Sequence, residues 1–275
     1  DATAVSVEFD LRITRVNNQG DGIGFAWLNA DEWGNGGSAP QFGEEPNIAG
    51  SFGVGFDPVN NSEVSDNHLS LHFNGAKLAD FNLTPLIAGF RLDNGLFHHA
   101  RIVLQAVAGG TTVSVYLTPN GGAEVAIVEN YLVNGMYAFD GGMAFGARNG
   151  GWRADNDLDN ISVSVTSGTP PALPALTLGA TVSGTLASAA QRDGYAFTLG
   201  AATRVAFDAL TNNGSLRWTL TGPRGTEVSS RTFTTSDSYD GYGVLELPAG
   251  DYVLTVHGAA SAYSFRLSDL ATATA

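Results

Sequence analysis

The sequence predicts an all-β protein made of two β-sandwich modules. Residues that favour strands are frequent, and the 35 glycines are spread along the 275 residues as turn punctuation. No long stretch repeats its apolar residues with the 3.6-residue period of a helix. A chain of this length holds one large β domain or two smaller ones.

Charge excludes one class of partner. The net charge is −14 and Lys77 is the only lysine, while the arginines form no basic run. A polyanion would be repelled, so we expect no nucleic-acid partner. The excess of carboxylates suits a secreted protein that binds calcium, although solubility alone would also explain it. Because no segment has about 18 consecutive apolar residues, we expect no membrane insertion.

The chain contains no cysteine. This excludes disulfides, thiolate nucleophiles and cysteine-based zinc sites. A cysteine-free secreted β protein is typical of bacteria, so we expect an extracellular or bacterial cell-surface location. The chain begins in the middle of a strand-like pattern, and we therefore expect neighbouring domains of a longer polypeptide.

The first module, residues 1–167, is predicted from a series of short strands. Apolar and polar residues alternate at period two in residues 100–105 and 112–117, and a hairpin signal, Ala108-Gly109-Gly110, lies between them. So many antiparallel strands imply two sheets packed face to face. The predicted strands span residues 5–13, 22–28, 50–56, 69–73, 100–106, 111–117, 143–147 and 161–165.

Prolines mark the boundary between the modules. Pro170, Pro171 and Pro174 fall within five positions, where they stiffen the backbone and remove ladder donors. We therefore predict a linker over residues 168–178 and a second module over residues 179–275.

The second module resembles the bacterial pre-peptidase C-terminal (PPC) domain. Residues 193–197 read D-G-Y-A-F, residues 220–225 read L-T-G-P-R-G, and residues 247–256 read L-P-A-G-D-Y-V-L-T-V. The resemblance covers nearly the whole module and implies a small jelly-roll-like sandwich with no catalytic residues.

Polar residues cluster between two strands of the first module. Residues 54–57 read V-G-F-D, so an apolar strand runs into Asp57, and polar oxygens recur as far as Asp66. His68 then opens the next strand. Hard oxygen ligands and one imidazole in a single loop are what a metal-organised binding site requires.

The first module resembles an L-type (legume-lectin-like, concanavalin A-like) lectin domain. The likeness rests on D-G-I-G-F-A-W at residues 21–27, V-G-F-D at 54–57, N-H-L-S-L at 67–71 and F-G-A-R-N-G at 145–150. It implies a concanavalin A-like jelly-roll β-sandwich, followed here by the second, smaller one.

The same resemblance implies a calcium ion. Asp57 would be a bidentate ligand, Val59 would offer its carbonyl and Asn61 its side chain, and either Glu63 or Asp66 would complete the shell. Family members with a second, transition-metal site have a glutamate where this chain has Gly55. We therefore expect calcium alone and a structural, hydrogen-bonding role for His68.

Carbohydrate binding follows from the resemblance as well. Asp21 would accept hydrogen bonds from sugar hydroxyls, although an Asp-Gly pair is also a common turn. The backbone of a glycine-rich loop would approach the sugar, and a later loop would set specificity. The expected sugar-binding residues are Asp21, Gly36, Gly37, Asn61, Asn149 and Trp152.

No catalytic motif is present. The E-x-D-x-x-E strand of the glucanases, the G-x-S-x-G elbow and the H-E-x-x-H helix are all absent from the sequence. We therefore expect a calcium-dependent carbohydrate-binding module of an adhesin-like protein, with a glycan or polysaccharide as partner. The alternatives are a protein-binding adhesion or scaffold module, and an ancillary fragment of a secreted polysaccharide-degrading enzyme.

Overall fold

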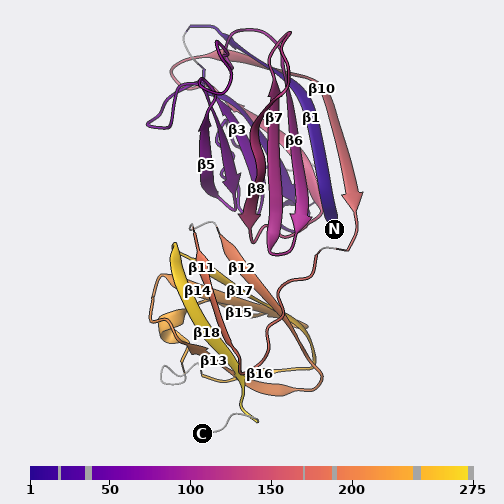
Figure 1. Ribbon diagram of the computed structural model, residues 1–275, viewed down its shortest axis with the longest axis vertical. Coiled ribbons are helices and arrows are strands. Elements are labelled where there is room, and N and C mark those ends of the chain that lie inside the picture. The colour runs from indigo at the N-terminus through magenta and orange to yellow at the C-terminus, as the bar shows by residue number, and fades with distance from the viewer. Residues whose placement is uncertain (18–19, 35–38, 170, 188–190, 238–242, 272–275) are drawn as a thin grey trace. The chain divides into compact units, whose positions relative to one another are not determined.

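A computed structural model describes residues 1–275 except 18–19, 35–38, 170, 188–190, 238–242 and 272–275. The chain divides into two units, Asp1–Pro170 and Pro171–Ala275 (Figure 1). Both consist of strands, and the described residues include only two short helices, α1 (Ala30–Trp33) and η1 (Phe233–Thr235). The predicted all-β class of jelly-roll β-sandwiches is confirmed. Among the described residues, no helix has the length and apolarity needed to span a membrane.

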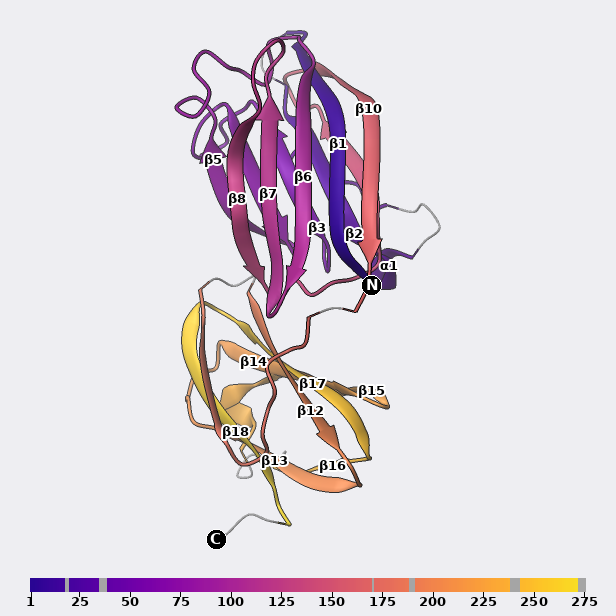
Figure 2. The same ribbon diagram turned by 45° about the vertical axis from the view of Figure 1, so that its right-hand side comes forward.

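The first unit contains two five-stranded antiparallel sheets. The sheet that we name the back sheet has the order β10-β1-β6-β7-β8, and Figure 2 shows these strands side by side. The front sheet has the order β5-β4-β3-β2-β9. The back strands are β1 (Ala2–Arg15), β6 (His98–Val107), β7 (Gly110–Thr118), β8 (Val125–Asn134) and β10 (Ala154–Ser167); the front strands are β2 (Gly22–Asn29), β3 (Phe52–Asp57), β4 (His68–Phe73), β5 (Ala76–Asn82) and β9 (Gly141–Arg148).

The core of the first unit lies between these two sheets. Along β1 every second residue from Val5 to Ile13 is buried, as the alternating pattern of the sequence requires. Phe9 of the back sheet packs edge-on against Phe56 of the front sheet, with ring centroids 5.8 Å apart. Apolar burial between the sheets thus fixes which face of β3 and β4 points outward.

The sequence did not predict two strands, β5 and β8. In β8 the alternation is interrupted near Asn130, which has a φ of 50°, and the register with β7 shifts there. In β5 the pairing with β4 shifts between Leu71 and His72. A bulge changes which face a side chain occupies, so a search for strict alternation misses such strands.

A loop covers the outer face of the front sheet. We call residues 39–49 the flap. Within it Glu44, Pro46 and Ile48 are buried, although the segment belongs to neither sheet. Ile48 forms a small outer cluster with Ala26 and Leu28 of β2.

Glycines of the front sheet make room for the flap. A Cβ atom on Gly24 would lie 2.1 Å from the carbonyl oxygen of Gly43, and one on Gly55 would lie 2.2 Å from that of Glu44. Such distances are impossible for real atoms, and backbone neighbours cannot rotate away. Close approach of two backbones therefore requires glycine at these positions.

The second unit contains two four-stranded antiparallel sheets, with the orders β11-β18-β13-β16 and β12-β17-β14-β15. Its core is rich in aromatic rings, and Phe207 stacks on Trp218 with ring centroids 4.2 Å apart. The strands are β11 (Thr181–Leu186), β12 (Arg192–Leu199), β13 (Thr203–Ala209), β14 (Leu216–Gly222), β15 (Gly225–Thr232), β16 (Leu245–Leu247), β17 (Gly250–Gly258) and β18 (Ser261–Asp269).

Part of the segment that we expected to be a linker belongs to the second unit. The N–H of Leu176 donates to the carbonyl of Ala196 at 2.8 Å, and the N–H of Ala196 donates to that of Pro174 at 3.0 Å. The side chain of Leu176 is buried in the core of the second unit. The two units divide between Pro170 and Pro171, inside the predicted linker, and the end of that linker already packs with the second unit.

Glycine at position 55 is expected to be essential to the packing of the flap. Gly55→Ala should lower the unfolding free energy of the first unit by about 1–3 kcal/mol, because the added methyl group strikes the backbone of Glu44. Gly142→Ala is the control, since a Cβ atom there meets open space. Differential scanning calorimetry measures both variants, and equal stabilities would contradict the packing account.

Candidate metal and ligand site

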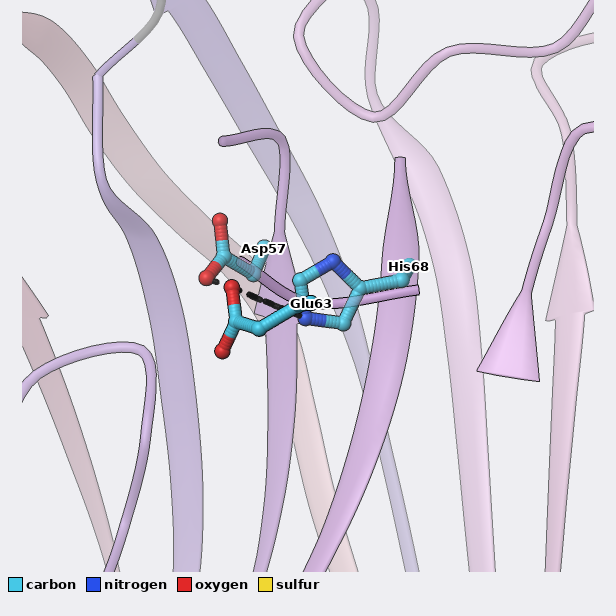
Figure 3. A group of neighbouring side chains, drawn as sticks. All are labelled: Asp57, Glu63 and His68. Carbon is cyan, nitrogen blue, oxygen red and sulfur yellow. Dashed lines mark ion pairs between the residues drawn. The ribbon is translucent and has the colours of Figure 1, made fainter. Parts of the chain in front are cut away.

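Three ligand-bearing side chains converge beside the ends of β3 and β4 (Figure 3). Asp57 ends β3 and pairs with His68, the first residue of β4, while the intervening loop brings back Glu63. The Nε2 atom of His68 lies 3.9 Å from Asp57 Oδ2 and 3.7 Å from Glu63 Oε2. The facing ligand atoms all lie within 4.8 Å of one another, as a shared cation requires.

One hydrogen bond fixes the tautomer of His68. Its Nδ1 lies 2.8 Å from the carbonyl oxygen of Ser65, which can only accept, so Nδ1 carries the proton. In the neutral ring Nε2 then offers a lone pair. This nitrogen is buried and has no hydrogen-bond partner among the described residues. A buried lone pair that faces carboxylate oxygens needs a proton or a cation.

Asp57 presents the second unpartnered atom. Its Oδ1 accepts the N–H of Val59 at 2.6 Å, whereas Oδ2 is buried without a partner among the described residues. Burial raises the pKa of Asp57 to about 8, against the lowering effect of that backbone hydrogen bond, and the nearby Glu63 and Glu44 add to the rise. Without a cation the carboxyl group therefore holds a proton at neutral pH.

Glu63 is the anionic member of the group. Its Oε2 accepts the N–H of Asn61 at 3.3 Å, and its Oε1 accepts a hydrogen bond from Lys77 Nζ at 3.2 Å. Burial alone would raise the pKa of Glu63, but hydrogen bonds from Glu45 and from the Asn61 backbone lower it overall. Its negative charge is available to a cation.

The sequence left open whether Glu63 or Asp66 completes the calcium shell, and in the structure these two carboxylates have different neighbours. Glu63 joins Asp57, whereas Asp66 Oδ2 accepts a hydrogen bond from Arg91 Nη1 at 3.0 Å. Arg91 also donates to the carbonyl of Asp66 at 2.9 Å. Asp66 is thus bound to an arginine 25 residues further along the chain.

The other two predicted metal ligands, Val59 and Asn61, differ in their exposure to solvent. Val59 is buried, and Asn61 is exposed on the same loop. The imidazole of His68 makes the expected hydrogen bond and also belongs to the cluster. The absence of a glutamate at position 55 does not remove the histidine from the set of candidate ligands.

Asp21 lies just before β2 and is held by an arginine. Arg148 Nε donates to Asp21 Oδ2 at 3.2 Å, and Arg148 Nη2 donates to Glu44 Oε1 of the flap at 2.6 Å. No other described residue hydrogen-bonds to the Asp21 carboxylate. The Gly20–Asp21 peptide is trans.

Glu44 is a buried acid at the tip of the flap. Burial raises its pKa, which Arg148 opposes, and its Oε2 has no hydrogen-bond partner among the described residues. The flap therefore links the Asp21 region to the acids around Asp57.

The remaining predicted sugar-binding residues differ in whether their side chains are already hydrogen-bonded within the protein or exposed to solvent. Asn149 Oδ1 accepts the N–H of Ala154 at 3.0 Å, and its Nδ2 donates to the Ala154 carbonyl at 3.1 Å. These two hydrogen bonds close a loop, and the role of Asn149 in facing a sugar stays a prediction. Trp152 is 46% exposed and offers a free ring face. Gly36 and Gly37 lie outside the described residues.

A hollow of about 960 Å³ lies between the flap and β9, within the upper range of ligand pockets. Several aromatic and amide side chains line it. Its lining includes Trp33, Gln41, Phe42, Asn47, Arg148 and Asn149. Of the residues named here only Asn149 was predicted to bind a sugar, because one wall of the hollow is the flap.

Comparisons with solved structures find lectins and the exoplasmic domain of VIP36. The chain is similar to lectin I-B4 from Griffonia simplicifolia in its metal-free form, at 16% identity over 60% of this chain and 72% of that one, with a TM-score of 0.41. A Lotus tetragonolobus seed lectin matches at 15% identity over 60% and 74%, with a TM-score of 0.39. The exoplasmic domain of VIP36, in a Ca²⁺- and Man3GlcNAc-bound form, matches at 15% over 61% and 70%, with a TM-score of 0.38.

No family model matches the chain, and no curated protein matches it. The identities and TM-scores of the solved structures are too low for any residue's role to be transferred. The chemistry of the site therefore rests on its own geometry.

The pKa of Asp57 predicts how stability depends on pH in the metal-free protein. Because folding raises this pKa from 3.8 to about 8, the group's stabilising contribution is complete below pH 3.8 and is lost as the pH rises through 8. Unfolding free energy should fall by up to about 1.4 kcal/mol per pH unit in that window.

Asp57→Asn should abolish this slope. Urea unfolding in chelator at a series of pH values provides the measurement, and the exposed Asp155→Asn variant is the control that should keep the slope. A wild-type profile that is flat from pH 4 to pH 8 would contradict the buried-acid account.

Proposed function

We propose that the first unit is a non-catalytic carbohydrate-binding module organised by a divalent cation. The observation that carries this proposal is the set of unpartnered, buried ligand atoms on Asp57 and His68, which face the anionic Glu63. Asp21 provides a mostly buried carboxylate on the same edge of the front sheet, linked to the cluster through Glu44.

The donor set bears on the identity of the ion. Asp57, Glu63 and the exposed Asn61 offer the oxygen ligands that calcium prefers, as we expected from the sequence. The imidazole of His68 suits a first-row transition ion such as Mn²⁺ or Zn²⁺. A cation would compensate the buried carboxylates and supply a fixed positive charge that orients the loop of residues 58–67.

Asp21 is the proposed sugar acceptor. Arg148 engages only one of its two oxygens, so the other can accept hydrogen bonds from hydroxyl groups. The exposed ring of Trp152 suits stacking on the apolar face of a pyranose. A secreted or cell-surface bacterial setting, with the second unit as a spacer, is part of the same proposal.

Removing the cation should destabilise the first unit. Because an ion that binds only the native state stabilises it, chelator should lower the melting temperature and added Mn²⁺ or Ca²⁺ should raise it. Calorimetric melting curves test this, and curves identical with and without chelator would remove the metal from the account.

His68→Asn distinguishes the two classes of ion. Loss of the imidazole should weaken Mn²⁺ binding at least about tenfold while Ca²⁺ binding changes little, if Ca²⁺ uses the oxygen ligands alone. Isothermal titration calorimetry measures both affinities. His99→Asn is the matched control, since His99 lies in the back sheet and is bound to Asp10.

Asp21→Ala should eliminate carbohydrate binding and leave the metal response intact. Two charge-assisted hydrogen bonds, each contributing about 1.5–3 kcal/mol, correspond to at least about a hundredfold in affinity. A glycan array followed by calorimetry on any hit provides the measurement, with Asp155→Asn as control.

Binding of the Asp21→Ala variant at wild-type strength would place the sugar elsewhere. Absence of binding to every glycan, with retained binding to a protein, would favour an adhesion or scaffold function instead.

A further inference from the structure

The cluster of Asp57, Glu63 and His68 needs a further ligand, and β3 cannot provide one at position 55. A side chain at Gly55 would collide with the carbonyl oxygen of Glu44 at 2.2 Å and with Ser70 Oγ at 2.3 Å. The flap backbone fills the space above this position. Asp57, Glu63 and His68 alone give three protein ligands, fewer than the four to eight ligands that divalent cations usually hold.

The flap that blocks position 55 also brings a carboxylate of its own. Glu45, next to Glu44 at the tip, is hydrogen-bonded to Glu63. Both acids contact the ammonium group of Lys77, whose Nζ lies 3.6 Å from Glu45 Oε1 and 3.2 Å from Glu63 Oε1. Glu63 therefore lies between Glu45 on one side and the buried His68 on the other.

Two carboxylates in contact repel each other unless a proton or a cation lies between them. Lys77 compensates only part of this charge, because it is also paired with Asp80 at 3.1 Å. The unpartnered Asp57 Oδ2 and His68 Nε2, both on buried side chains, show where further positive charge is needed. The side chain of Glu45 is 36% exposed, so it has room to turn from Lys77 toward that point.

We propose that Glu45 is the fourth protein ligand of the cation bound by Asp57, Glu63 and His68. This inference rests on the proposed function. It assigns to the flap the carboxylate that Gly55 cannot carry, and it ties the flap tip to the loop between β3 and β4 whenever the cation is bound.

The test compares Glu45→Gln with Lys77→Met in the full chain. Calorimetric titration of the metal-free proteins with Mn²⁺ should give about 10–100-fold weaker binding for Glu45→Gln. Lys77→Met should bind Mn²⁺ as tightly as the wild type or more tightly, because it removes a competing positive charge. If Glu45 acted only through its ion pair with Lys77, both variants would be weakened alike, and this result would overturn the proposal.

Hydrogen exchange gives a readout that does not depend on affinity. At saturating Mn²⁺ the amides of Gly43, Glu44 and Glu45 should exchange more slowly than in the metal-free wild type, and this protection should be absent in Glu45→Gln. Equal protection in both proteins would overturn the proposal.

Two further results distinguish a failure of the fold or of the proposed function from a failure of the role of Glu45. Equal melting temperatures of metal-free Glu45→Gln and wild type would show that the substitution leaves the fold intact. If Glu45→Gln melts at a lower temperature, the Glu45→Asp variant keeps a carboxylate and should restore Mn²⁺ binding. Absence of Mn²⁺ and Ca²⁺ binding by the wild type would reject the proposed function itself, whereas wild-type affinity in Glu45→Gln would reject only the role of Glu45.

Discussion

The close contact between the flap and the glycines of the front sheet determines the chemistry of the whole site. Because Gly24 and Gly55 have no side chains, the backbone of residues 43–44 lies directly on β2 and β3. That position directs Glu44 toward Arg148 and brings Glu45 to Glu63. Without this contact, Glu44 would not reach Arg148 and Glu45 would not reach Glu63.

Charge is concentrated at this edge of the first unit. The chain has a net charge of −14, and its only lysine, Lys77, contacts three carboxylates beside the cluster. Arg148 holds two more on the other side. Even so, buried oxygens of Asp57 and Glu44 remain without partners among the described residues. Lys77 and Arg148 thus face six neighbouring acids, Asp57 included, which is the electrostatic basis for the proposed ion.

Local patterns in the sequence were sufficient for the strands and for part of the site. The period-two burial of β1 follows from short-range alternation, and the position of Asp57 at the end of β3 follows from an apolar segment that runs into a carboxylate. Long-range contacts decided the rest. Arg91 takes Asp66 away from the cluster, and the backbone of Ala154 occupies the amide of Asn149. The flap has no periodic signal, since its burial depends on glycines in strands that precede and follow it.

Gly24 and Gly55 leave space on the outer face of the front sheet, and the flap occupies that space. At Gly24 and Gly55 the central strands offer no side chain, so the surface there comes from the eleven-residue flap, beside the Asp57 and His68 side chains that the sheet contributes. An exchange of residues 39–49 for another segment of similar backbone path would give the same sandwich a new surface. The sandwich and this part of its outer surface are thus encoded in separate segments of the chain, which makes the flap a natural place to graft a different surface.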